Sequence, residues 1–375
     1  MQKIETKHLQ TVIADHTQDM SGRVVAITGT TSGTGYVCAR ELAKLGATVL
    51  LLNRDSDRSV SARQRLESEV PDGTFVAITC DLQNFASVRA AAQEIGRRYD
   101  RLDALCNNAG VMALPDQATA DGYDVQMQTN SIAPFLLTKE LFGLLRRSDD
   151  GRVVNQSSLA RRGAGHDPMY FGRNGGDLGG DGSPEDNAAL RGPRWQRYHQ
   201  SKLANCTFTY GLQQRLDERG ITTVKALLAH PGFAATSLQT NSASTGGMDV
   251  DSGLMSQAQS AEDGALGIIR ACADPGARPG DFFGPEGYTG FPGRLPPEDL
   301  LTDPENIRIC WEGCEAAVGA FELGVSRCPT AAVIPPIGPD SLRAPVATVT
   351  VRRSNTVARR VVDVAVGPVD VERGS

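Results

Sequence analysis

The sequence lacks three features, and each absence excludes a class of protein. It has no basic excess: 38 Lys and Arg stand against 44 Asp and Glu, with a pI near 5.5, which argues against a partner such as nucleic acid. It has no apolar run of about 18 residues, the length that spans a membrane. Residues 1–20 are charged throughout and have no apolar signal segment. We therefore expect a cytoplasmic protein without nucleic-acid partners or stable membrane insertion.

The eight cysteines do not follow a metal-binding pattern. Most lie in apolar surroundings, as Cys80 does in FVAITCDL and Cys106 in LDALCNNAG, where cysteine behaves as a small hydrophobic residue. Cys310 and Cys314 could share one face of a helix, but neither a second pair nor a His cluster completes a zinc site. We expect no metal centre.

What the sequence contains is a globular composition, with 40% hydrophobic and 22% charged residues. We divide it into an N-terminal extension (1–20), one domain (21–323) and a C-terminal tail (324–375). The tail is rich in Pro, Val and Arg, and we expect it to be disordered or loosely packed, although VATVTVRRSNTVARRVVDVAV alternates enough for a hairpin. Within the domain, residues 161–195 are dense in Gly, Asp and Pro, which predicts a long loop.

Between Arg23 and Gly232, short apolar runs alternate with longer amphipathic stretches. The predicted buried strands are RVVAIT, TVLLLN, TFVAIT, LDALCN, GRVVNQSS and TTVKALLAH. The predicted helices include 37–45, 85–98, 126–145 and 196–219. This alternation predicts an α/β fold: a single Rossmann-type, doubly wound parallel sheet with helices on both faces.

A glycine-rich turn joins the first predicted strand to the first predicted helix of this fold. It reads Thr28-Gly29-Thr30-Thr31-Ser32-Gly33-Thr34-Gly35. Such a turn lets the backbone approach a pyrophosphate, and the helix N-terminus supplies N–H donors. Taken alone, the glycines could also serve only a tight turn between strand and helix.

Four further motifs follow in order. They are Asn107-Asn108-Ala109-Gly110, Asn130 in NSIAPFLLT, Ser157-Ser158, and Tyr198-His199-Gln200-Ser201-Lys202. Together with the T-G-x-x-x-G-x-G turn, they resemble the short-chain dehydrogenase/reductase family. The resemblance runs from about Ser21 to Gly232 and more loosely to about Leu323, and within the family it favours members like retinol dehydrogenases and protochlorophyllide reductases.

Tyr198 and Lys202 are the predicted catalytic centre. Their i,i+4 spacing places them on one face of a helix, where an ammonium stabilises a phenolate and lowers a pKa that is normally about 10. The resemblance implies that Lys202 also holds the nicotinamide ribose, that Ser158 bonds the substrate oxygen, and that Asn130 assists a water-mediated proton relay. Ser157 is the alternative serine, and Asn130 could instead satisfy only a helix backbone.

The same resemblance implies a set of cofactor contacts. Asp81 is expected at the adenine, with Leu82 beside it, and Pro231, Gly232 and Thr236 near the carboxamide. The remaining contacts expected from the motifs are Thr28, Gly29, Thr31, Ser32, Gly33, Gly35, Asn108, Ala109 and Gly110, with Tyr198 and Lys202.

The end of the second predicted strand indicates which nicotinamide cofactor is used. NAD enzymes carry an acidic residue there, whereas an arginine accommodates the 2′-phosphate of NADP. This chain has Asn53 followed by Arg54, with Arg58 a turn later. We expect NADP(H), and NAD(H) stays possible because Asp55 or Asp57 could reach the ribose.

These features predict an NADP(H)-dependent oxidoreductase that transfers hydride between nicotinamide and a carbonyl or alcohol, with a lipophilic or cyclic substrate. The alternatives are a C=C reductase of the protochlorophyllide reductase kind and a non-catalytic dinucleotide sensor. Trp195 could line the pocket or pack under the loop, whereas His199 and His230 have no necessary role. The resemblance also implies a homodimer or homotetramer formed through the helix that carries Tyr198.

Overall fold

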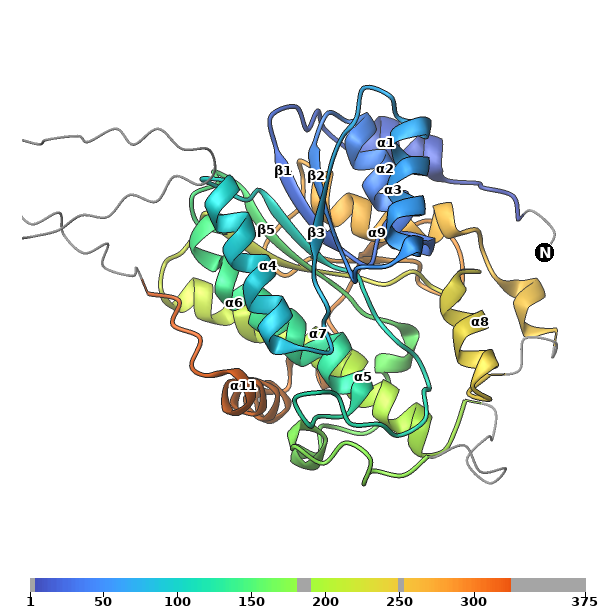
Figure 1. Ribbon diagram of the computed structural model, residues 1–375, viewed down its shortest axis with the longest axis vertical. Helices are drawn as coiled ribbons and strands as arrows, with labels where there is room; N and C mark the ends of the chain where they lie inside the picture. Colours follow the sequence, from blue (N-terminus) through green and yellow to red (C-terminus); the bar gives the residue numbers. More distant parts are fainter. Residues whose placement is uncertain (1–3, 181–189, 249–252, 325–375) are drawn as a thin grey trace, which may run out of the picture. The chain divides into compact units, whose positions relative to one another are not determined.

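The computed structural model describes residues 4–180, 190–248 and 253–324, which form a sheet of eight strands between two layers of helices (Figure 1). The strand order is β3-β2-β1-β4-β5-β6-β7-β8. The strands are β1 (Val24–Thr28), β2 (Thr48–Asn53), β3 (Thr74–Thr79), β4 (Ala104–Asn107), β5 (Gly151–Gln156), β6 (Val224–Ala229), β7 (Phe282–Gly284) and β8 (Gly293–Leu295). Neighbouring strands are parallel, except that β8 is antiparallel to β7.

The predicted doubly wound fold is confirmed. The six runs predicted as strands are β1 to β6, and the central strands are buried along almost their whole length because helices cover both faces of the sheet. The chain order reverses between β1 and β4. Such a reversal leaves a crevice at the carboxyl ends of the strands, where open α/β sheets bind their ligands.

One face of the sheet is covered by α1 (Leu9–His16), α2 (Gly33–Lys44), α3 (Asp57–Glu69) and α9 (Ala261–Ala273). Part of this layer comes from the predicted N-terminal extension. Val12 and Met20 are buried in its core, and the backbone N–H groups of Lys7 and His8 donate to the carboxylate of Asp263 at 2.8 and 2.9 Å. The described part of the extension, residues 4–20, is therefore packed onto the domain.

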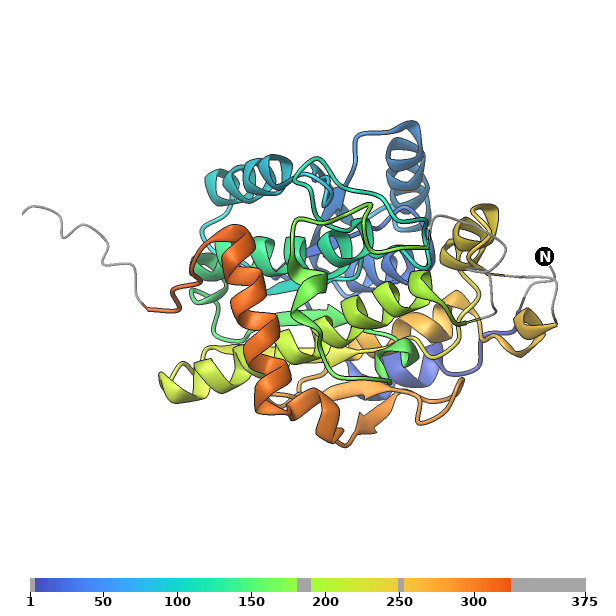
Figure 2. The same cartoon turned by 90° about the horizontal axis from the view of Figure 1, so that it is seen from below.

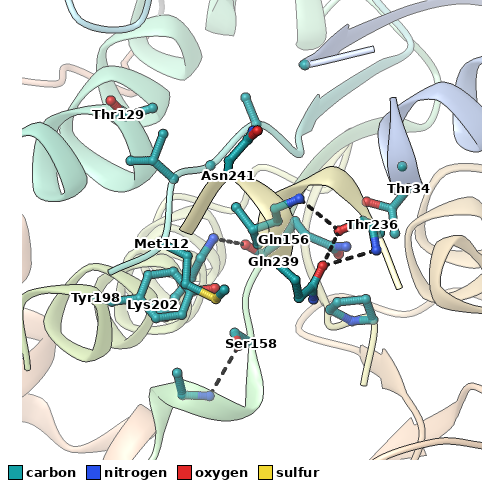
Figure 3. Close-up of a pocket in the computed structure, with 18 of the residues that line it drawn as sticks. Thr34, Met112, Thr129, Gln156, Ser158, Tyr198, Lys202, Thr236, Gln239 and Asn241 are labelled. Atoms are coloured by element: carbon teal, nitrogen blue, oxygen red, sulfur yellow. Dashed lines mark hydrogen bonds between the residues drawn. The ribbon is translucent and has the colours of Figure 1, made fainter. Parts of the chain in front are cut away.

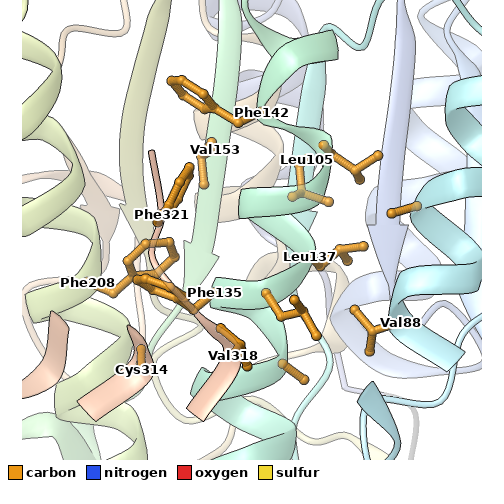
Figure 4. Packing of buried hydrophobic residues seen from close by; sticks show 14 of the residues in the cluster. Val88, Leu105, Phe135, Leu137, Phe142, Val153, Phe208, Cys314, Val318 and Phe321 are labelled. Atoms are coloured by element: carbon orange, nitrogen blue, oxygen red, sulfur yellow. The ribbon is translucent and has the colours of Figure 1, made fainter. Parts of the chain in front are cut away.

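The other face is covered by α4 (Phe85–Arg98), α6 (Ala133–Leu145), α7 (Pro193–Glu218) and α11 (Pro304–Val318). Figure 2 shows α11 crossing α7. Trp311 of α11 and Phe321 after it pack on Phe135 of α6. Figure 4 shows Phe135 and Phe321 in this core. Association of copies through α7 stays a prediction, and it would have to use a part of α7 that α11 does not cover.

The segment predicted as a long loop, 161–195, is described except for residues 181–189. The short turn η2 (Leu159–Arg161) leads into this segment, η3 (Pro168–Phe171) lies within it, and α7 begins within it at Pro193. The His166 ring lies 3.0 Å from both Gln200 Oε1 and Thr207 Oγ1 on α7, and η3 packs against α11. The tail predicted as disordered or loosely packed lies, from residue 325 onward, outside the described residues.

Shorter elements complete the described chain: α5 (Val125–Met127), the π-helical turn η1 (Gln128–Ile132), α8 (Ser237–Ser244), η5 (Leu254–Gln257) and α10 (Asp299–Thr302). In this part of the chain, no helix combines the length and the hydropathy needed to cross a bilayer.

Candidate active site

A cavity of about 990 Å³ opens at the carboxyl ends of the central strands (Figure 3). Most residues predicted from the sequence line it: Gly29, Thr31, Ser32, Gly33, Arg54, Asp81, Leu82, Asn108, Ala109, Gly110, Ser158, Tyr198, Lys202, Pro231, Gly232 and Thr236. Thr28, Gly35 and Asn130 are not part of its lining. These three lie behind the wall and hold it in place.

The glycine turn forms one end of the cavity, and its glycines are required by close packing. Gly29 has a φ of +73°, and a Cβ there would lie 2.9 Å from Cα of Ala109. A Cβ on Gly35 would lie 2.3 Å from Nδ2 of Asn108. Asn108 itself donates to the Thr28 carbonyl at 2.9 Å and accepts from Thr34 Oγ1 at 2.8 Å. Thr28, Gly35 and Asn108 thus fix the backbone of the turn between β1 and β4.

Cationic side chains border this end of the cavity. Arg54 and Arg58 line it, and Arg58 Nη2 donates to Ser32 Oγ in the glycine turn at 2.7 Å. Asn53, in the position of an NAD enzyme's acidic residue, is bonded to Thr30 through both side-chain atoms, at 2.7 and 2.9 Å. The described carboxylates Asp55 and Asp57 are not among the lining residues.

Asp81 and Leu82 follow β3 and line the cavity beyond β2. Asp81 Oδ1 accepts from Gln83 N at 3.0 Å, and Asp81 N donates to Ser87 Oγ at 2.9 Å. These bonds fix the turn between β3 and α4, which carries Asp81 and Leu82 into the cavity lining.

Tyr198 and Lys202 lie side by side in the wall of the cavity, as their spacing predicts (Figure 3). Lys202 Nζ is 5.9 Å from the centroid of the Tyr198 ring. Burial raises the pKa of the Tyr198 phenol to about 12, and a hydrogen bond with Ser158 partly offsets this rise. The lowered phenol pKa predicted from the sequence is therefore wrong for the protein alone, because desolvation of the phenolate outweighs the distant ammonium.

Lys202 is held from below by two acceptors. Its Nζ donates to the Gln156 carbonyl at 3.0 Å and to Asn205 Oδ1 at 3.3 Å. Burial lowers the pKa of Lys202 to about 8. The ammonium is thus still the main form at neutral pH, but it is easily discharged.

The two adjacent serines have different surroundings. Ser157 Oγ donates to the Lys202 carbonyl at 2.9 Å and accepts from Cys206 Sγ at 3.1 Å, so it is tied into the base of α7. Ser158 caps η2 and is the serine that bonds to Tyr198. This placement favours Ser158 over Ser157 as the serine beside the reacting oxygen.

Asn130 lies in the π-helical turn η1 and is buried. Its side chain exchanges hydrogen bonds with the backbone of Val111, at 2.8 and 2.9 Å, and donates to Ser201 Oγ at 2.9 Å. The side chain therefore joins the loop after β4 to α7 instead of facing the cavity.

The opposite end of the cavity is apolar. Met112, Trp195, Leu238 and Met248 surround Tyr198, and the Trp195 ring meets the Tyr198 ring edge-on at 5.8 Å. From the sequence, the role of Trp195 was open, and the other three residues were not predicted. The one local signal was Thr236 with Gln239, a capping box that starts α8 and carries Leu238 into the cavity.

Pro231 and Gly232 line the cavity after β6. Gly232 has a φ of +60°, and a Cβ there would lie 2.4 Å from the Tyr288 carbonyl oxygen. Gly232 N donates to His230 Nδ1 at 3.0 Å, and burial lowers the pKa of His230 to about 3. The His199 ring contacts the carbonyls of Ala160 and Ala164 at 2.8 and 2.9 Å. His199 and His230 thus both bond main-chain groups.

In the described part of the chain, three cysteines form a cluster. The Sγ atoms of Cys38, Cys106 and Cys272 lie within 4.8 Å of one another, buried in the core between the sheet and α2 and α9. None of the three lines the cavity. Cys310 and Cys314 are buried on the inner face of α11.

Comparison with known proteins gives the same family as the sequence motifs indicate. Residues 23–171 match the short chain dehydrogenase family. The chain is 38% identical over 229 residues to retinol dehydrogenase 14 of Mus musculus (58% of this chain, 63% of that protein), and 34% identical over 233 residues to retinol dehydrogenase 11 of Homo sapiens (62% and 67%). Several of the curated relatives it matches are thus covered over less than two thirds of their length.

A solved structure of a putative uncharacterized protein from Mycobacterium Paratuberculosis superposes with a TM-score of 0.63 at 32% identity, covering 83% of this chain and 98% of that one. The motifs, the sheet topology and these similarities agree, and the chain belongs to the short-chain dehydrogenase/reductase family.

Proposed function

We propose that this protein is an NADP(H)-dependent oxidoreductase that transfers hydride between nicotinamide and a lipophilic or cyclic carbonyl or alcohol, with Tyr198 as general acid/base. One observation carries the proposal. Tyr198, Lys202 and Ser158 meet in the middle of a cavity whose one end is a glycine turn bordered by arginines and whose other end is apolar.

The first end fits a dinucleotide. Gly29 and Gly35 leave the backbone accessible where a Cβ would collide with its surroundings, and Gly33 has a φ of +60° that favours glycine. The N-terminus of α2 offers N–H donors to a pyrophosphate. Arg54 and Arg58 would hold a 2′-phosphate, which favours NADP(H) over NAD(H). We expect Asp81 and Leu82 at the adenine, and Pro231, Gly232 and Thr236 at the carboxamide. When bound, the cofactor supplies or takes the hydride.

The residues in the middle supply the proton chemistry. With a pKa of about 12, the Tyr198 phenol is protonated at neutral pH, so its Oη–H can donate to a carbonyl oxygen as that oxygen becomes an alcohol. Ser158 Oγ would donate a second hydrogen bond to the same oxygen. The Lys202 ammonium, at the floor of the site, would stabilise the phenolate that remains. A protonated phenol is the form that can act as the acid when a carbonyl is reduced.

The apolar end supports a lipophilic substrate. Met112, Trp195, Leu238 and Met248 give the wall beside Tyr198 a cluster of apolar side chains, and burial of apolar surface is the main source of affinity for such a ligand. The names of the retinol dehydrogenases among the relatives make all-trans-retinal a suitable first probe.

The test is a paired titration of the full chain with NADPH and NADH by nicotinamide fluorescence, followed by turnover of all-trans-retinal, cyclohexanone and hexanal with the tighter cofactor. We expect tighter NADPH binding and formation of the alcohol. Binding of neither cofactor would overturn the proposal. A product reduced at a C=C bond while the carbonyl is kept would replace it with a C=C reductase, and binding without turnover would indicate a dinucleotide sensor.

A further inference from the structure

The side chain of Asn205 lies buried beneath the catalytic centre, between two groups of the site. Its Oδ1 accepts from Lys202 Nζ at 3.3 Å, and its Nδ2 donates to the Asn130 main-chain carbonyl at 2.6 Å. The orientation of the amide is fixed by its partners, because an ammonium can only donate and a carbonyl can only accept. The carboxamide therefore bridges the lysine to η1.

The sequence explains why the carbonyl of Asn130 is available for this bridge. In an α-helix it would accept from the N–H of residue 134, but that residue is Pro134, which has no N–H. The helix widens into the π turn Gln128–Ile132 at this point. The Asn130 carbonyl thus has no donor at the i+4 position, and it accepts from the side chain of Asn205 on α7.

We infer that Asn205 is a positioning residue of the reaction proposed above: its carboxamide ties the Lys202 ammonium to the main-chain carbonyl of Asn130 and so fixes the location and the charge of that ammonium. The inference rests on the proposed function only for its kinetic consequence. The placement of Asn205 and its effect on Lys202 can be measured without any turnover.

The geometry around Lys202 shows what the bridge does. An ammonium has three N–H donors, and the Gln156 carbonyl and Asn205 Oδ1 take two of them from below. A Cβ on Gly110 would lie 3.3 Å from Nζ, so the loop after β4 closes another side. The third donor is left for the cavity, which Lys202 lines together with Tyr198.

Few charges compete with Asn205 for control of this ammonium. Among the described residues, the titratable groups that face Lys202 are Tyr198 and Cys206, both on α7. Gln156 of β5, Gly110 of the loop after β4 and Asn130 of η1 carry no charge. An acceptor for the ammonium favours its charged form, so removing the Asn205 oxygen lowers the pKa of a lysine that burial already holds near 8.

The experiment compares Asn205→Leu, Asn205→Asp and, as the matched control, Thr207→Val in the full chain. Thr207 is buried on the same helix and contacts His166, so its replacement also breaks a buried hydrogen bond but leaves Lys202 alone. The titration of Lys202 is followed by NMR through the ¹³Cε signal of labelled lysine, which Lys202→Arg assigns. Turnover of all-trans-retinal with NADPH is followed across the pH range.

We expect Asn205→Leu to lower the pKa of Lys202 by about one unit, the size of a hydrogen bond to a charged group. Its kcat should fall about 10- to 100-fold, and its KM should stay nearly unchanged. The basic limb of its kcat–pH profile should shift to lower pH. Asn205→Asp places a carboxylate beside the ammonium and should raise the pKa of Lys202. Thr207→Val should change neither the pKa of Lys202 nor kcat.

An unchanged Lys202 titration in Asn205→Leu would overturn the inference. So would equal effects of the Leu and Asp variants, because a structural role alone gives no opposite shifts in pKa. If Asn205→Leu does not fold, the direction of the shift in Asn205→Asp decides. Absence of turnover in the unaltered protein, with opposite Lys202 shifts in the variants, would refute the proposed function and keep the role of Asn205 at Lys202.

Discussion

The two ends of the cavity are built in different ways. At the cofactor end, backbone forms the wall: Gly29 and Gly33 have positive φ, and Asn108 bonds the main chain of the turn. At the substrate end the wall consists of side chains, Met112, Trp195, Leu238 and Met248, which come from three separate segments of the chain. A turn made of backbone tolerates few substitutions, whereas an apolar wall only needs surface of suitable shape. The first end therefore fixes one kind of ligand, and the second can be changed to suit another.

Tyr198 lies between these two ends, and its loss should have the largest effect. We expect Tyr198→Phe to lower kcat by about 10²- to 10⁴-fold, the usual contribution of a general acid, because the carbonyl oxygen then has no phenol proton to accept. NADPH affinity should stay within about twofold, since the ring remains in place. Fluorescence titration and steady-state kinetics measure the two quantities.

Tyr210→Phe is the matched control on the same helix. Tyr210 lies outside the cavity lining, in the cluster with Leu203 and Phe282. Turnover should persist in this control. Unchanged turnover in Tyr198→Phe would show that Tyr198 does not transfer the proton. The cofactor end and the substrate end would then meet at some other reacting group.

The backbone construction of the cofactor end can be broken at Gly35. An alanine Cβ there would lie 2.3 Å from both Asn108 Nδ2 and the Gly29 carbonyl, so the turn must shift. We expect Gly35→Ala to cost about 1 to 3 kcal/mol of stability, as overpacking does, and to weaken both NADPH and NADH. Thermal unfolding and cofactor titration check this.

Gly96→Ala is the matched control: it makes the same chemical change as Gly35→Ala but should stabilise the protein. Gly96 lies inside α4, and nothing lies within 4 Å of a Cβ built there. Alanine should stabilise the helix by about 0.5 to 1 kcal/mol and leave cofactor binding unchanged. If Gly35→Ala is as harmless as Gly96→Ala, the turn is not held as tightly as its contacts indicate.

The sequence predicted the backbone end far better than the side-chain end. The glycine turn, the Asn108 motif and the Tyr198–Lys202 pair could be found because each needs particular residue types at fixed local spacings. The apolar wall could not be found, since a leucine or methionine in the sequence does not show which cavity it will face. The phenol pKa was predicted in the wrong direction because it depends on burial, and Asn205 was missed because its partner is a carbonyl of a distant helix.

The arginines at the cofactor end test one group of the cofactor, the 2′-phosphate that distinguishes NADPH from NADH. We expect Arg54→Ala and Arg58→Ala to weaken NADPH by about 10- to 100-fold each, the range of a hydrogen bond to a charged group, and to change NADH by less than about threefold. Arg63→Ala, on the same helix as Arg58 but paired with Glu67, is the control. Equal losses for both cofactors would count against a 2′-phosphate contact.

Trp195 tests the other end, with the smallest expected effect. Trp195→Ala removes the ring that meets Tyr198 edge-on, and we expect KM for all-trans-retinal to rise about 10-fold, because an aromatic contact contributes about 0.5 to 1.5 kcal/mol beyond its buried area. KM for hexanal and the affinity for NADPH should hardly change. Trp195→Phe, which loses the bond from Nε1 to the Gly247 carbonyl but keeps a ring, should retain most of the affinity for retinal. If Trp195→Ala instead weakens NADPH as much as retinal, the ring supports the whole cavity, and the two ends cannot be changed independently.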